Sequence, residues 1–235
     1  MTAIYKKELR TYFLSPIGYV FIAVFLAFSG WFFTTINLLQ AVGDMSYVFS
    51  NLTTVFLFLI PILTMRSLAE EKNSKTDQLL LTAPISIGSI VMGKVLAAVT
   101  VFMIALLITL LYPIILTMFT EPAWGEIVGN YIGFFLMGAA FVSIGVFISS
   151  LTENQIISAV CTFAILLLLF MIEWISPSIN NTFLLSVIDW LAITKRFNDF
   201  ATGIVNLESV VYYLSIVAVF SFLTVRHLEK RRWSK

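Results

Sequence analysis

Charged residues are scarce in this 235-residue sequence. Asp, Glu, Lys and Arg together make up 11% of it, whereas they make up roughly a quarter of an ordinary soluble domain. Hydrophobic residues account for 60% of the chain, and the mean hydropathy is +0.98. So few charges cannot cover a water-facing surface. The composition therefore excludes an ordinary soluble protein and indicates an integral membrane protein.

Cysteine and histidine each occur once, as Cys161 and His227. A single cysteine excludes an intramolecular disulfide and a cysteine-based metal site, and we interpret Cys161 as a small packing residue. His227 lies among arginines and lysines near the C-terminus, where the sequence offers no second ligand for a metal or a haem. We therefore expect no metal site in this chain.

Motifs for catalysis and for nucleotide binding are absent as well. The sequence has no Gly-x-Ser-x-Gly elbow, no His-Glu-x-x-His zinc pair and no cluster of aspartates. It also lacks the Gly-x-x-x-x-Gly-Lys-Ser/Thr loop that holds the phosphates of ATP. We expect neither enzymatic activity nor a cofactor in this chain, so the energy for any mechanical work has to come from another subunit.

Long apolar runs are what the sequence has in abundance. A helix needs about 20 apolar residues to cross the hydrocarbon core, and these runs are continuous rather than alternating, which excludes barrel strands. The predicted fold class is an all-α integral membrane protein. It forms one domain, residues 1–235, because no segment between the runs is large enough to fold alone. The six predicted spans are residues 17–39, 47–65, 88–118, 127–150, 155–175 and 210–226.

The distribution of lysine and arginine predicts how the chain is oriented. All basic residues except Lys195 and Arg196 fall before the first span, around the loop after the second, or after the sixth. An even number of spans places these segments on one side of the membrane. Because short cytoplasmic segments are rich in Lys and Arg, we expect that side, with both termini, to be cytoplasmic.

Residues 4–13 are amphipathic when drawn as a helix, which predicts an N-terminal interfacial helix on the cytoplasmic surface. One face carries Ile4, Tyr5, Leu9, Tyr12 and Phe13, and another carries Lys6, Lys7 and Arg10.

Ionisable residues are almost missing from the predicted spans, where an unpaired charge costs about 2.5–3.5 kcal/mol on insertion scales. Only Lys94 and Glu173 lie within them, each near an end. We interpret both as interfacial anchors, with Lys94 extending to the cytoplasmic headgroups. A substrate or proton site is the alternative.

The most polar interruption is "TMRSLAEEKNSKTDQLLLTAPIS", residues 64–86. The pattern predicts helical turns through 66–72, a break at Asn73-Ser74 and a short helix over 76–82 with Thr76 as N-cap. Glu71 and Lys75 are spaced to form a helix-stabilising pair. The residues alone leave two interpretations: the leucines at 79–81 dock on a soluble partner, or they enter lipid.

A family resemblance favours the first interpretation. The run Arg66…Glu70-Glu71-Lys72…Thr76…Leu79-Leu80…Pro84…Gly93-Lys94 resembles the segment between the second and third spans of type 2 ABC exporter permeases. The nearest likeness is to the gliding-motility-associated branch, which is related to the permease for nitrous-oxide-reductase maturation. Residues 6–25 resemble that branch's N-terminal interfacial helix and first span, residues 145–159 its turn between the fourth and fifth spans, and residues 196–215 its approach to the sixth.

The resemblance implies a permease half-transporter in the inner membrane of a prokaryote. Its partners would be the lipid bilayer, two copies of a cytoplasmic ATPase that binds ATP and Mg, a second permease, and in some systems a membrane-anchored protein with an extracytoplasmic domain; no nucleic acid is expected. A coupling helix would contact the ATPase through Arg66, Glu70, Glu71, Lys72, Thr76, Leu79, Leu80 and Pro84. A second cytoplasmic contact would comprise Ser150, Thr152, Glu153, Asn154 and Gln155.

Two segments depart from this pattern or leave it open. The family often has Gly-Thr where this chain has Lys75-Thr76, so a left-handed turn is not implied there. Residues 176–209 contain an apolar stretch too short to cross, for which the resemblance implies a re-entrant or interfacial helix pair on the outer side. Lys195, Arg196 and Asp199 are interpreted as headgroup anchors of this segment, with a cap on a substrate path as the alternative.

For the chain as a whole, the alternative to a permease is a non-transporting scaffold of an envelope or motility assembly.

Overall fold

The computed structural model describes residues 1–78, 85–175 and 192–233, and all regular secondary structure among these residues is helical, with no strand. Among these residues, six helical segments are long and apolar enough to cross a membrane, which confirms the predicted all-α architecture with six spans. They are Pro16–Leu38, Ser46–Asn73, Ile87–Leu116, Trp124–Leu151, Gln155–Ile172 and Leu207–Arg231.

The helices are assigned as follows. The first three are α1 (Thr2–Leu14), α2 (Pro16–Phe32) and the π-helix η1 (Phe33–Leu38), which continues α2. Next come α3 (Ser46–Thr64), α4 (Ala69–Asn73), α6 (Ile87–Ile108) and α7 (Leu111–Leu116). The chain continues with α8 (Trp124–Leu151), α9 (Gln155–Ile175), α11 (Lys195–Ala201) and α12 (Leu207–Trp233).

The third span is broken between α6 and α7, close to Pro113. A proline has no N–H with which to bond the carbonyl four residues earlier, and for Pro113 that carbonyl belongs to Thr109. The Thr109 carbonyl instead accepts from the Tyr112 backbone N–H at 2.9 Å and from the Tyr131 hydroxyl at 2.7 Å. Tyr131 on α8 thus satisfies the polar group that the proline leaves free.

Helix α8 forms the centre of the bundle and contacts α3, α6, α9, α11 and α12. About 72% of the most apolar stretch of α8 is buried inside the bundle, against 17% for the corresponding stretch of α9. Of the six spans, α9 therefore leaves the largest share of its surface uncovered by other helices. Glycines allow the close approach: a Cβ on Gly138 would lie 2.4 Å from Phe102 on α6, and one on Gly145 would lie 2.3 Å from Thr64 on α3.

An aromatic cluster joins four of the spans. Phe25 of α2, Phe56 of α3, Phe102 of α6 and Phe134 of α8 are all fully buried. The Phe56 and Phe134 rings are stacked with centroids 4.4 Å apart, and the Phe102 ring meets Phe56 edge-on at 5.1 Å. Such offset and edge-on pairs are favourable ring geometries, and they fix how α2, α3, α6 and α8 face one another.

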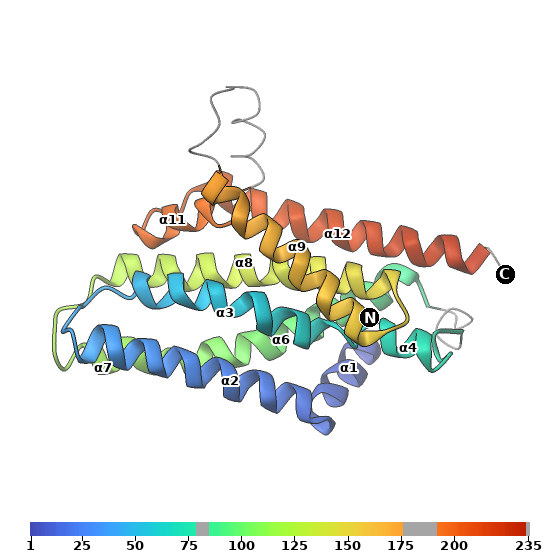
Figure 1. The fold of residues 1–235 in the computed structure, drawn as a ribbon, viewed down its shortest axis with the longest axis horizontal. Coiled ribbons are helices and arrows are strands. Elements are labelled where there is room, and N and C mark those ends of the chain that lie inside the picture. The colour runs from blue at the N-terminus through green and yellow to red at the C-terminus, as the bar shows by residue number, and fades with distance from the viewer. Residues whose placement is uncertain (79–84, 176–191, 234–235) are drawn as a thin grey trace.

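The two ends of the bundle differ in composition (Figure 1). Helix α1, the loop containing α4, the turn after α8 and the end of α12 lie at one end, where the basic residues gather, and α7 and α11 lie at the other. We call the first the basic end. Its elements are the ones that the charge distribution grouped on one side of the membrane.

The outer segment is only partly described. Most of the short apolar stretch within 176–209, namely residues 182–193, lies outside the described residues, and so does the side chain of Glu173. Helix α11 buries Phe197 and Phe200, and a Cβ on Gly133 would lie 2.6 Å from the Phe200 side chain. Arg196 pairs with Glu208 at 2.9 Å and stacks over the Tyr212 ring.

The prediction that Arg196 and Asp199 contact lipid headgroups is therefore wrong, because both side chains contact residues of α12. Asp199 accepts a hydrogen bond from the Ser209 hydroxyl at 3.0 Å, so both side chains bind α12 rather than reaching out to lipid. These contacts fasten α11 to the last span.

Replacing Phe134 with alanine tests the aromatic cluster. We expect the free energy of unfolding in detergent to fall by about 2–4 kcal/mol, because packing is lost around the cavity even where lipid lessens the transfer term. Phe119→Ala, at a ring that is 70% exposed, is the control and should change stability little. Equal losses in both variants, measured by thermal unfolding, would contradict the assignment.

Candidate functional site

The loop between α3 and α6 is positioned by a serine of the central helix. The Ser149 hydroxyl of α8 accepts from the backbone N–H groups of Leu68 and Ala69, both at 3.1 Å, and donates to the Met65 carbonyl at 3.1 Å. The first amides of a helix have no partner within it, so Ser149 caps α4 from another helix. This contact fixes α4 against α8.

Lys94 of α6 is buried, with a side chain that is 1% exposed. Its ammonium lies 3.0 Å from Glu8 Oε1, 2.9 Å from Glu71 Oε2 and 2.7 Å from the Ser67 carbonyl. The Lys94 ammonium donates hydrogen bonds to Glu8 Oε1 and to the Ser67 carbonyl, and its contact with Glu71 is an ion pair. The interpretation of Lys94 as a headgroup anchor is therefore wrong, because α1 and α4 bring carboxylates to it and it has no need to reach the surface.

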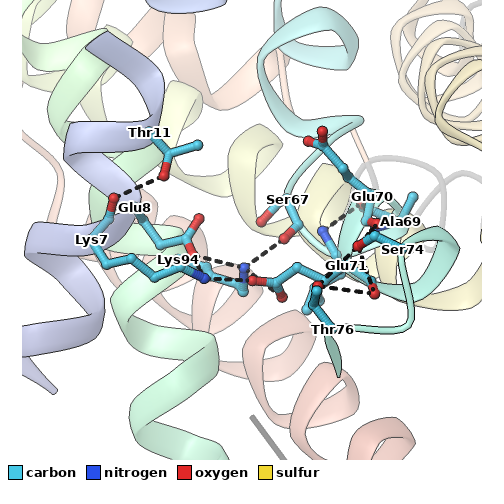
Figure 2. A network of polar contacts seen from close by, with 12 residues as sticks. Lys7, Glu8, Thr11, Ser67, Ala69, Glu70, Glu71, Ser74, Thr76 and Lys94 are labelled. Carbon is cyan, nitrogen blue, oxygen red and sulfur yellow. Dashed lines mark hydrogen bonds and ion pairs between the residues drawn. The ribbon is translucent and has the colours of Figure 1, made fainter. Parts of the chain in front are cut away.

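Lys7 completes a group of four charges, Lys7, Glu8, Glu71 and Lys94, that we call the ion network (Figure 2). Its ammonium lies 2.9 Å from Glu71 Oε1 and 3.3 Å from Glu8 Oε1. Burial by itself lowers the pKa of Lys7, but its hydrogen bond to Glu71 and the charges of Glu71 and Glu8 outweigh burial and raise that pKa above its ordinary value. Two cations and two anions cancel, which allows Glu8, Glu71 and Lys94 to be largely buried while Lys7 closes the network from its half-exposed position.

The ion network joins α1, α4 and α6, and apolar contacts reinforce the joint. Ile4 of α1 packs against Gly93 of α6, where a Cβ would lie 2.9 Å from the Ile4 side chain. Burial raises the pKa of the Tyr12 hydroxyl, so it stays protonated and donates to the Leu63 carbonyl of α3 at 3.1 Å. The predicted N-terminal helix exists, and its buried face carries Glu8 between Ile4 and Tyr12.

The predicted Glu71–Lys75 pair is wrong, since the Glu71 carboxylate turns toward Lys7 and Lys94. Lys75 is exposed and has a φ of 58°, in the left-handed region. Its backbone N–H donates to the Lys72 carbonyl at 3.1 Å, and the Ser74 N–H donates to the Glu70 carbonyl at 2.9 Å. These bonds end α4, so the left-handed turn is present although lysine replaces the glycine that usually forms it.

The chain is helical again at Asp77 and Gln78, directly after Thr76, as expected if Thr76 stands at a helix start. Leu79, Leu80 and Pro84 of the predicted coupling contact lie outside the described residues. Within the described part, Arg66 forms a bidentate ion pair with Glu70 at the surface.

The second predicted contact forms the turn between α8 and α9. The Asn154 carboxamide accepts from the Ile156 and Ile157 backbone N–H groups at 2.9 and 3.4 Å, which caps α9. The Thr152 hydroxyl accepts from the Asn154 N–H at 3.1 Å. Asn73 of α4 lines one shallow depression together with Glu153, Asn154 and Gln155.

Lys72 connects the two predicted contacts directly, since its ammonium donates to the Ser150 carbonyl. Residues that are about 80 positions apart in the chain, 65–78 and 149–155, thus form one continuous surface at the basic end. Among the described residues, no group of three or more His, Cys, Asp or Glu side chains is placed to hold a metal ion.

Sequence reasoning missed several residues of this surface. Arg231 of α12 pairs with Glu153 at 3.1 Å and with Asp77 at 3.3 Å, so it ties the last helix to both contacts. Glu8, Lys7 and Ser149 were missed as well. A signal for Glu8 was available: it lies four residues from both Ile4 and Tyr12, on the stripe predicted to be buried. No comparable signal marks Arg231 among the other basic residues of the tail.

Lys94→Met tests the ion network. The variant leaves two buried carboxylates with only the half-exposed Lys7, and we expect it to lower the free energy of unfolding by about 3–5 kcal/mol. Lys94→Met combined with Glu8→Gln keeps a neutral Lys7–Glu71 pair and should recover a large part of the loss in a double-mutant cycle. Lys6→Met, at an exposed position, is the matched control. Additive effects of the two substitutions would refute the network.

Lys75→Gly tests the left-handed turn. Glycine adopts this conformation without a Cβ penalty, so the variant should be about 0.5–1 kcal/mol more stable, with slower hydrogen exchange at the Ser74 and Lys75 amides. Asn73→Gly, inside α4, should instead lose stability because glycine is a poor helix residue. The turn is misassigned if both glycines destabilise equally.

Comparison with known proteins agrees with this architecture. The family described as "ABC-2 family transporter protein" matches residues 2–228. No curated protein matches the chain. The family match extends over α1, the first five spans, both predicted contacts and most of the sixth span in α12. This chain therefore belongs to the ABC-2 family of transporter proteins.

Proposed function

We propose that this chain is the permease subunit of an ATP-binding-cassette transporter and that it moves substrate across the membrane with energy from a separate ATPase. Family membership supports the permease role. The observation that carries the rest is the surface at the basic end, where segments 65–78 and 149–155 meet and are fastened to the spans by buried polar contacts.

A force on this surface would reach α6 and α1 through the ion network. Glu71 of α4 binds Lys94 of α6 and Lys7 of α1, and separating such a pair leaves an uncompensated buried charge at a cost of about 3–5 kcal/mol. The three helices therefore move as one body. Because α1 is followed after Ser15 by α2, motion of α1 also moves the first span.

A second route leads to the centre of the bundle. Ser149 and Ser150 hold the loop to the cytoplasmic end of α8 in our proposed orientation, and α8 contacts α3, α6, α9 and α12. Displacing the loop would therefore tilt the central helix together with its neighbours. Rigid-body motion of a half-transporter is a recognised form of such switching.

The proposed assembly contains two permeases and two ATPases, with ATP and Mg bound by the ATPases. The bundle would lie in the inner membrane of a prokaryote with both termini in the cytoplasm, which is supported by the basic residues at the end that carries α1 and the end of α12. We further propose the gliding-motility-associated branch as the nearest one, on the likeness of segments 6–25, 145–159 and 196–215.

Copurification from native membranes tests the proposal. We expect a stoichiometric ATPase to accompany the full chain, and we expect Leu80→Asp to reduce its recovery by tenfold or more, because a charge would enter an apolar docking surface. Leu39→Asp is the matched control: Leu39 is 76% exposed and follows η1 at the opposite end of the bundle.

Comparable expression of the wild-type chain and both variants, checked by membrane-fraction immunoblot, is required for the comparison. If no ATPase accompanies the wild-type chain, or if Leu80→Asp and Leu39→Asp retain it equally, the proposed coupling surface is wrong. In the first case a scaffold role becomes the better account.

A further inference from the structure

A second polar depression opens at the basic end, on the side of α12. It has a volume of about 370 Å³ and is formed by α4, the turn after α8 and the last turns of α12. We call it the basic cleft. Its lining residues are Lys72, Leu151, Glu153, His227, Lys230 and Arg231.

The charge of the basic cleft is positive. Its lining contains three cations, Lys72, Lys230 and Arg231, and one carboxylate, Glu153; with Asp77, which pairs with Arg231, the net charge is +1 with His227 neutral. Arg231 is already bound to Glu153 and Asp77. Within the described residues, Lys72 and Lys230 form no ion pair; Lys72, a residue that is 6% exposed, donates a hydrogen bond from its ammonium to the neutral Ser150 carbonyl. An anion in the cleft would complete the charge balance.

The basic cleft lies at the depth of the lipid headgroups. Helix α12 has 27 residues, which span about 40 Å at 1.5 Å per residue, whereas the hydrocarbon core is about 30 Å thick. Its apolar run ends at Val225, and the three cleft residues of α12 follow within two turns. These side chains therefore leave the hydrocarbon where phosphate groups are densest.

Apolar surface adjoins the cations on the membrane side. Leu151, which lines the cleft, is 52% exposed, and Leu223, one helical turn before His227, is 39% exposed. Residues four apart share a helix face, so Leu223 continues the cleft toward the hydrocarbon. Cations bordered by exposed leucines match an anionic headgroup followed by an acyl chain, whereas a free anion would make no use of the leucines.

We propose that the basic cleft binds the phosphate group of an anionic phospholipid. Lys72 and Lys230 contact the phosphate, and the acyl chains lie along Leu151 and Leu223. This inference requires only that the chain spans a membrane; it does not depend on a transport function. A lipid bound here would touch α4, the turn after α8 and α12 together, and so would stabilise the contacts that Arg231 makes among them.

The experiment uses the purified full chain in non-ionic detergent, titrated with short-chain phosphatidylglycerol, phosphatidylcholine or inorganic phosphate. A ligand that binds the folded state raises the unfolding midpoint, and the rise grows with the logarithm of one plus the ratio of free ligand concentration to Kd. We expect phosphatidylglycerol to raise it and the other two probes to leave it nearly unchanged. Lys230→Gln should weaken phosphatidylglycerol binding about fivefold, the value of one cation near an anionic lipid surface, and Lys230→Arg should restore it.

Arg226→Gln is the matched control, because Arg226 lies on the same helix but outside the cleft lining, is paired with Glu229 at 3.0 Å and stacks on the Phe222 ring. The proposal is overturned if phosphatidylcholine binds as well as phosphatidylglycerol, or if the Lys230 and Arg226 variants lose equal affinity. Equal stabilisation by inorganic phosphate would identify a free-anion site instead. Loss of a copurifying ATPase in Lys230→Gln, with lipid affinity unchanged, would assign the cleft to that partner.

Discussion

The buried ammonium of Lys94 is the constraint around which the basic end is organised. Lys94 lies near the start of α6, and its side chain is 1% exposed. A charge buried in this way has to be paired and hydrogen-bonded. Glu8 of α1 and the Ser67 carbonyl, in the turn between α3 and α4, accept its hydrogen bonds, and Glu71 of α4 adds an ion pair. The N-terminal helix is therefore held to the loop and to α6 by electrostatics, and its apolar contacts add packing to that joint.

Helix α4 places its charges on two different sides. Glu71 enters the ion network on the side of α1, and the next residue, Lys72, reaches the Ser150 carbonyl and the basic cleft on the side of α12. Ser149 caps the start of the helix from α8. A five-residue helix that is too short to be stable alone is thus held from three directions, as the proposed coupling role requires.

The six spans, the N-terminal helix and the polar loop were all predictable from composition and periodicity, because a bilayer imposes a length and an apolar character that can be read from the chain. The loop's break was predicted at the right place, but Lys75 hid its left-handed turn, since a lysine gives no sign of a positive φ. The predicted partners of Glu71 and Arg196 were wrong for a common reason. Local spacing suggested neighbours in sequence or lipid, while the fold offered charges from distant helices.

By itself the sequence determined that this chain crosses a membrane six times and gathers its basic residues at one end of the bundle. Hydrophobic length and charge asymmetry act on each segment separately, so no tertiary information is needed to read them. Only the tertiary structure decided that Lys94 is buried, that Ser149 caps α4 and that Arg231 joins the tail to both predicted contacts. These outcomes depend on which side chains from remote segments come within hydrogen-bonding distance, and packing of the helices against α8 sets that distance.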